Sequence, residues 1–230
     1  MAVLLPAAPM CPKPGEWPLT GRAAELAAVD AVLGRPGAGG VVLVGMPGAG
    51  TSRLVREAVR QVAASGRTVE MFTATRAAAT IPFGAFARLL TGFDRAGADR
   101  LELFVAAVEA LGVEPGAGPG RSLAPPPLVL GVDDGHLLDQ AGAALLHQLA
   151  STGAAHVVVG LSTGSPTPEP ILALWKDGPA QRLEVGPLGQ PAVEELLVDV
   201  LGGPLDGAAL LDLWRAGRGN VRLLHELVLA

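Results

Sequence analysis

The chain of 230 residues contains no tyrosine and only one cysteine, Cys11. A single cysteine excludes an intrachain disulfide, so the fold must be held together by its apolar core. Aromatic residues are also scarce, with five Phe and three Trp. This shortage argues against a surface on which the bases of single-stranded nucleic acid stack.

Positive charge is scarce as well, since 17 Lys and Arg face 22 Asp and Glu for a formal net charge of -5. Without a basic stripe to displace counterions, we expect no direct nucleic-acid binding by this segment. No apolar run approaches the length of a membrane-spanning helix. The N-terminus lacks the basic region of a signal peptide, and Pro6 and Pro9 interrupt its apolar residues. These absences favour a cytoplasmic protein that does not contact a membrane.

The most informative motif is the sequence GMPGAGTS at residues 45–52. It follows an apolar run and precedes a helical pattern, which is the strand, glycine loop and helix arrangement that binds phosphate. Gly45, Gly48 and Gly50 supply the glycines of a P-loop, whose backbone N–H groups surround phosphate oxygens. In a chain with 31 Gly, a glycine cluster alone would indicate only a turn. The lysine of the pattern G-x-x-x-x-G-K-[ST] is missing, because Thr51 stands in its place.

A second motif, LVLGVDD at residues 128–134, is an apolar strand that ends in two carboxylates. Acidic groups at such a strand end hold Mg²⁺ beside the phosphates of a nucleotide. The alternative is that Asp133 and Asp134 only favour the start of a helix. The P-loop elsewhere in the chain favours the metal-binding interpretation.

The chain alternates between strand and helix patterns over residues 17–186, with strands expected at 41–44, 68–73, 128–133, 155–161 and 181–185. This predicts an α/β fold of the P-loop NTPase type, a five-stranded parallel sheet with helices on both faces. Ligands of such sheets bind at the carboxyl ends of the strands. We expect the P-loop strand to lie directly beside the strand that carries Asp133.

The two ends of the chain differ from this core. Residues 187–230 are helical throughout and predict a small lid, whose apolar ending looks truncated. Residues 1–16 contain four prolines and predict a disordered lead, and parts of residues 113–127 are expected to be poorly ordered for the same reason.

Five segments in this order resemble the N-terminal ATPase module of the large LuxR-type (MalT-like) transcriptional regulators, which belong to the STAND branch of the AAA+-related P-loop NTPases. They are LTGRAAEL at 19–26, IPFGAFARLL at 81–90, VDDGHLLD at 132–139, RLEVGPL at 182–188 and GNVRLLHELV at 219–228. The resemblance covers about residues 17–230. It implies that the partners are a nucleotide and the remaining domains of a longer regulator or its oligomer.

The resemblance also implies a site for ATP or ADP with Mg²⁺. Ser52 and Asp133 would hold the metal, and Asp134 would be the catalytic residue that polarises an attacking water. Arg22 would lie near the nucleotide, and its alternative role is a surface salt bridge at a helix start. The nucleotide-binding residues would be Arg22, Gly45, Gly48, Ala49, Gly50, Thr51, Ser52 and Arg53.

Three departures from the family pattern bear on function. Thr51 removes the phosphate lysine, Ser162 stands where an arginine is usual, and Val221 stands where a proline is common. The intact Ser52 and acidic pair favour a nucleotide-binding regulatory switch with weak or absent ATP hydrolysis. Thr51 and Ser162 favour the alternative, a pseudo-ATPase interaction scaffold that no longer binds nucleotide. A small-molecule kinase is disfavoured by the lost lysine and by the lack of an acceptor-site motif.

Overall fold

The computed structural model describes residues 17–93, 98–113 and 128–229. Its five strands form one parallel sheet with the order β2-β3-β4-β1-β5. The strands are β1 (Gly40–Gly45), β2 (Thr68–Thr73), β3 (Leu128–Asp133), β4 (His156–Ser162) and β5 (Ala180–Val185). The predicted α/β fold is therefore confirmed. The disorder predicted for residues 1–16 and for most of 113–127 lies outside the described residues.

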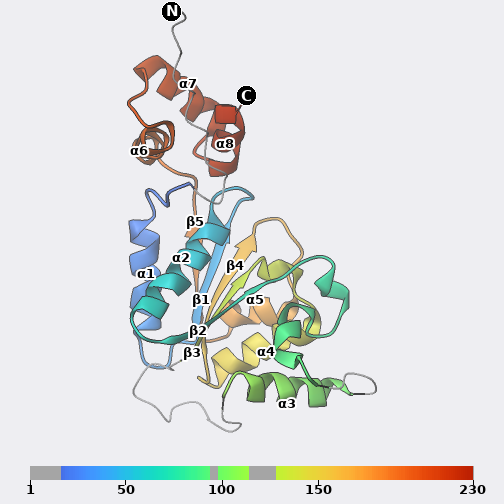
Figure 1. Ribbon diagram of the computed structural model, residues 1–230. Helices are drawn as coiled ribbons and strands as arrows, with labels where there is room; N and C mark the ends of the chain where they lie inside the picture. The colour runs from blue at the N-terminus through green and yellow to red at the C-terminus, as the bar shows by residue number, and fades with distance from the viewer. Residues whose placement is uncertain (1–16, 94–97, 114–127, 230) are drawn as a thin grey trace, which may run out of the picture.

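Helices cover both faces of the sheet (Figure 1). One face packs against α1 (Ala23–Leu33) and α2 (Thr51–Ala64). The other face packs against α3, α4, α5 and the 3-10 helix η3. These elements are η3 (Gly84–Leu90), α3 (Arg100–Ala110), α4 (Gln140–Ser151) and α5 (Glu169–Lys176), with the short turns η2 (Ala78–Thr80) and η4 (Gly135–Leu137) beside them.

The apolar run of β1 shows why both faces are covered. Successive side chains of a strand point to opposite faces. Val41 and Leu43 accordingly pack in the α1 and α2 cluster, whereas Val42 and Val44 pack in the cluster on the other face. A central parallel strand must therefore be apolar at every position, as the sequence of β1 is.

The prediction that the P-loop strand β1 lies directly beside the Asp133 strand β3 is wrong. Strand β4 lies between β1 and β3, so the strand of Asp133 is not beside the P-loop strand. Thr51 at the start of α2 and Asp133 at the end of β3 nevertheless both lie close to Gly160 of β4. A Cβ at Gly160 would lie 3.4 Å from Thr51 Cγ2 and 3.7 Å from Asp133 Oδ1. The pairing order of buried parallel strands leaves no trace in their apolar pattern, which is why the sequence did not reveal the insertion.

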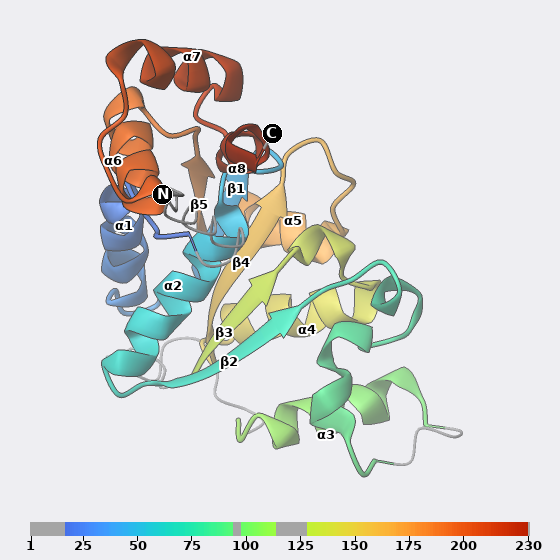
Figure 2. The same cartoon turned by 45° about the horizontal axis from the view of Figure 1, so that its top comes forward.

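Three helices form a separate layer beyond the carboxyl ends of the strands, and we call them the lid (Figure 2). They are α6 (Gln190–Leu201), α7 (Gly207–Gly217) and α8 (Val221–Leu229). Their apolar cluster includes Trp17, which is 2% exposed and has its ring 5.2 Å from that of His225. The first described residue thus packs with the last helices. None of the helices in the described ranges is both long and apolar enough to cross a membrane.

The opposite end of the sheet holds a buried histidine at the start of β4. His156 is fully buried, and its Nδ1 lies 2.8 Å from Arg67 Nη2. Because a guanidinium has only donors, Nδ1 accepts and the imidazole is neutral. Burial, and after it the charge of Arg67, lowers the pKa of His156 to about 4.

We expect this histidine to make the fold less stable in acid. The ordinary pKa of histidine is 6.5, so between pH 6.5 and pH 4 this imidazole is protonated in the unfolded chain and neutral in the folded chain. The free energy of unfolding is therefore lower at pH 4 than at pH 7. This group alone accounts for a loss of about 3 kcal/mol between the two. Urea unfolding of the wild type and of His156→Gln at several pH values measures the effect. The stability difference between them should change with pH, and a constant difference would contradict the assignment.

Candidate functional site

The loop after β1 has the backbone geometry of a P-loop. Gly48 and Gly50 have φ angles of +85° and +94°, a region that side-chain-bearing residues rarely adopt. Helix α2 begins directly afterwards at Thr51, so its N-terminus faces the loop. The loop glycines expected from the motif therefore have a conformational reason to be glycine.

The outer side of this loop is bonded to segments far away in the sequence. Asn220 Nδ2 donates to the carbonyl of Pro47 at 2.9 Å, and the backbone N–H of Arg222 donates to the carbonyl of Gly48 at 3.3 Å. Gly48 must lack a side chain for this contact, because a Cβ there would lie 2.4 Å from Asn220 Oδ1. The start of α8 thus rests directly on the P-loop.

These bonds also orient the N–H groups of the loop. A peptide unit is rigid and planar, and its N–H points opposite to its C=O. Because the carbonyl of Pro47 points to Asn220, the N–H of Gly48 points away from Asn220. Contact with the lid and contact with a ligand inside the loop therefore depend on the same peptide unit.

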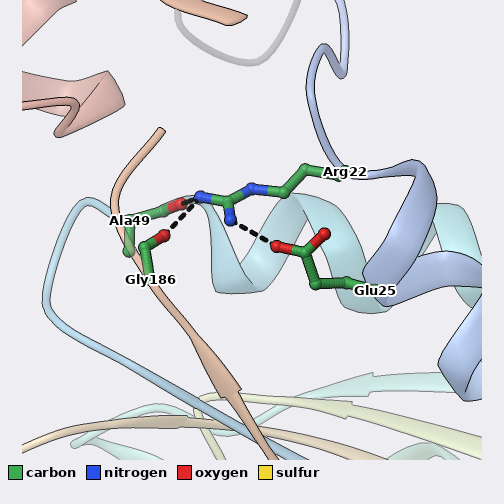
Figure 3. A network of polar contacts seen from close by, with 4 residues as sticks. All are labelled: Arg22, Glu25, Ala49 and Gly186. Carbon is green, nitrogen blue, oxygen red and sulfur yellow. Dashed lines mark hydrogen bonds and ion pairs between the residues drawn. The ribbon is translucent and has the colours of Figure 1, made fainter. Parts of the chain in front are cut away.

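Arg22 completes the outer contacts of the loop (Figure 3). Its Nη2 donates to the carbonyl of Ala49 at 2.8 Å and to that of Gly186 at 2.7 Å, while Nη1 pairs with Glu25 at 2.6 Å. The side chain is only 4% exposed. Arg22 thus makes the ion pair at a helix start that its alternative interpretation proposed, but in a buried position that joins α1, the P-loop and the residue after β5.

A cavity of about 270 Å³ lies between the loop and the lid. One part of its wall is apolar and includes Trp17, Leu188, Leu196 and Val221. The other part is formed by loop and α2 residues together with arginines. The predicted nucleotide-binding residues that line the cavity are Arg22, Gly48, Ala49, Gly50, Thr51, Ser52 and Arg53. Gly45 instead lies buried at the end of β1.

Two further arginines line the same cavity and were missed from the sequence. Arg56 lies four residues after Ser52, on the same face of α2. Arg222 follows the GNV segment at the start of α8. The helical spacing from Ser52 was a signal that could have identified Arg56. Nothing local identifies Arg222 without knowledge of how the lid packs.

The acidic pair lies beside this cavity, and neither carboxylate is among its lining residues. Asp133 is 2% exposed, and its Oδ2 accepts from Arg56 Nη2 at 2.8 Å. Its Oδ1 accepts the backbone N–H of Asp134 at 3.0 Å. Burial, followed by the charge of Asp133, raises the pKa of Asp134, while His136 and Arg56 act in the opposite direction.

The cavity fits a phosphate group better than it fits Mg²⁺. Arg53, Arg56 and Arg222 on its lining are cations that suit phosphate oxygens. The hydroxyl of Thr51 is buried against Gly45 and has no hydrogen-bond partner among the described residues. The carboxylate expected to hold the metal is instead engaged through both oxygens, one of them by a cation. In the described residues no group of three or more His, Cys, Asp or Glu side chains could hold a metal ion.

The family model for the AAA ATPase domain matches residues 18–159, and the chain therefore belongs to that family. Its members generally bind ATP and Mg²⁺. No curated protein sequence matches the chain.

Solved structures with the same fold include proteins from three organisms. The DNA-bound ORC1 protein of Aeropyrum pernix is 17% identical with a TM-score of 0.62, and the match covers 94% of this chain and 60% of the ORC1 chain. The Cdc6p of Pyrobaculum aerophilum is 16% identical with a TM-score of 0.60, covering 97% and 62%. The AMPPCP-bound DnaA of Aquifex aeolicus is 12% identical with a TM-score of 0.57, covering 90% and 60%. At these identities the likeness shows the AAA+ fold alone, and the chain spans about 60% of the length of these proteins.

Removing Arg22 should destabilise the whole arrangement. The change Arg22→Leu leaves two carbonyl groups and Glu25 without their donor, which we expect to cost about 3 kcal/mol in the free energy of unfolding. The matched control is Arg35→Leu, which removes one exposed contact to Gln181 and should cost less than about 1 kcal/mol. Urea denaturation measures both. Equal losses in the two variants would show that Arg22 has no special structural role.

Proposed function

We propose that this domain is the nucleotide-binding switch module of a larger LuxR-type transcriptional regulator, binding ATP or ADP with weak or absent hydrolysis. The observation that supports this best is the cavity between the P-loop and a lid that is hydrogen-bonded to the loop itself. The apolar wall suits a base, and the cationic wall suits phosphates.

The contact between lid and loop gives the switch a physical basis. A ligand shifts a conformational equilibrium only if it binds the two states unequally. A phosphate that bonds the N–H of Gly48 also fixes the carbonyl of Pro47 on the other side of the same peptide unit. That carbonyl bonds Asn220 of the lid. Occupancy of the loop and position of the lid are therefore coupled through one peptide plane.

Weak hydrolysis follows from the charges that the site lacks. The loss of one charge-assisted hydrogen bond costs about 1.5–3 kcal/mol, which is about tenfold to 150-fold in affinity. Phosphoryl transfer depends almost wholly on positioning and on cations that offset the charge of the transition state. Thr51 and Ser162 each stand where the family supplies a cation. Binding is retained in this proposal because Arg53, Arg56 and Arg222 line the cavity.

The proposal that this domain is part of a larger regulator rests on the order of the motifs at residues 19–26, 132–139 and 219–228. In this proposal the partners are the remaining domains of the regulator or its oligomer. The net charge of -5 argues that nucleic-acid contacts are made by another part of that protein.

One observation favours the alternative of a pseudo-ATPase scaffold. The ion pair between Arg56 and Asp133 occupies the carboxylate that the family uses for its metal. If the cavity takes no nucleotide, the loop and lid remain as a rigid surface for other proteins. The two candidates differ in a direct binding experiment.

Hydrogen exchange with and without ATP or ADP tests the proposed switch. We expect nucleotide to change the exchange of residues 46–50 and 219–229 together, because the two segments share hydrogen bonds. In Asn220→Ala, the loop should still respond and the lid should respond much less. Nucleotide binding that protects the loop but leaves the wild-type lid unchanged would contradict the switch. Absence of binding in calorimetry would favour the scaffold.

Restoring the lysine should strengthen binding. We expect Thr51→Lys to tighten the binding of ATP by about tenfold or more, which corresponds to one charged contact. Thr51→Met, of similar length but without charge, is the control and should not tighten it. The wild type should hydrolyse ATP near background, and the double change Thr51→Lys with Ser162→Arg should raise turnover more than Thr51→Lys alone. Ordinary turnover by the wild type that is lost in Asp133→Ala would refute the proposal of weak hydrolysis.

A further inference from the structure

Arg56 connects the loop helix to the end of β3. It lies one helical turn after Ser52, so both side chains lie on the same face of α2. Its Nη2 donates to Oδ2 of the buried Asp133 at 2.8 Å, and Oδ1 of that carboxylate accepts the N–H of Asp134. The guanidinium therefore lies against Asp133, one of the two residues that the sequence assigned to the metal, and shares a helix face with the other, Ser52.

This arrangement is unfavourable for Mg²⁺. The ion needs a near-octahedral set of oxygen ligands at about 2.0–2.1 Å. A guanidinium bound to the same carboxylate repels a second cation, and its displacement would break a charge-assisted hydrogen bond to a buried acid. Breaking such a pair is costly because the carboxylate would be left buried without its partner.

Arg56 is also placed to meet phosphate. Its side chain is 54% exposed and lines the cavity, although one of its nitrogen atoms bonds Asp133. A guanidinium has five N–H donors in a planar fork, so the remaining donors can bind phosphate oxygens. Its charge is permanent and does not depend on a supply of metal. Arg53 and Arg222 also line the cavity and add positive charge to it.

We propose that the Arg56 guanidinium takes the place of Mg²⁺ in this site, and that the cavity binds metal-free nucleoside di- or triphosphates. This inference rests on the proposed nucleotide binding and adds that the binding is independent of divalent cations. Arg56 then neutralises phosphate charge from the side of α2 that the metal occupies in Mg²⁺-dependent sites.

Calorimetric titration of ATP and of ADP into the full chain, in EDTA and in excess Mg²⁺, tests this inference. The wild type should bind with affinities that agree within about threefold between the two buffers. Arg56→Gln keeps an N–H donor for Asp133 but removes the charge, so metal-free binding should weaken by about tenfold or more. Mg²⁺ should then restore much of it, because the competing cation is gone.

Two further variants sharpen the comparison. Arg60→Gln removes another arginine of α2, one turn further on, which pairs with Glu57 and does not line the cavity. It should behave as the wild type in both buffers. Arg56→Lys retains a positive charge and should retain most of the metal-free affinity. Circular dichroism verifies that each variant is folded, and the wild-type comparison decides the question even where a variant does not fold.

The outcomes separate this inference from the proposed function. Wild-type binding that is tighter by about tenfold or more in Mg²⁺ than in EDTA would overturn the role of Arg56 and leave the nucleotide switch standing. Unchanged metal-free affinity in Arg56→Gln would overturn it too. Absence of binding to either nucleotide in both buffers would refute the proposed function and, with it, this inference.

Discussion

The outward-facing carbonyls of Pro47, Gly48 and Ala49 fix the geometry of the site. Each accepts a hydrogen bond from outside the loop, from Asn220, from the backbone of Arg222 and from Arg22. Since a peptide unit is rigid, the direction of each carbonyl sets the direction of the next N–H. The loop therefore owes its shape to the lid and to the segment before α1 as well as to its glycines. Burial of Trp17 in the lid cluster ties that segment to the lid again.

Positive charge in this site comes from a different place than in an ordinary P-loop. A lysine at position 51 would extend from the rigid end of the loop, but Thr51 carries no charge. Four arginines line the cavity instead. Arg22 is paired with Glu25, whereas α2 contributes Arg53 and Arg56, and the lid contributes Arg222. In the proposed function, part of the charge that holds an anion therefore depends on the position of the lid. Affinity for phosphate and closure of the lid are linked by this placement.

The sequence predicted elements well and their arrangement less well. The apolar run at 128–133 matches β3, which is buried at every position. The alternation at residues 68–73 matches the position of β2, although burial along that edge strand does not alternate. The insertion of β4 between β1 and β3 was missed, because all three strands are apolar and a pattern does not encode partners. Gly48, Thr51 and Arg22 were predicted as site residues, and they do line one cavity. Arg222 belongs to it only because α8 folds back onto the loop from the far end of the chain.

Several P-loop features in this chain have structural reasons that are independent of catalysis. Gly48 makes room for Asn220, Gly45 makes room for the hydroxyl of Thr51, and Arg22 satisfies buried carbonyl groups. Their presence is therefore weak support for ATP hydrolysis. The hydroxyl of Thr51 is different, because it is buried without a partner among the described residues. An unsatisfied buried polar group costs about 1–3 kcal/mol. The hydroxyl lies against Gly45, which does not line the cavity, so Thr51 offers an anion there neither a charge nor an accessible hydroxyl. In the proposed function the phosphates are therefore held by Arg53 and Arg56 of α2 and by Arg222 of the lid.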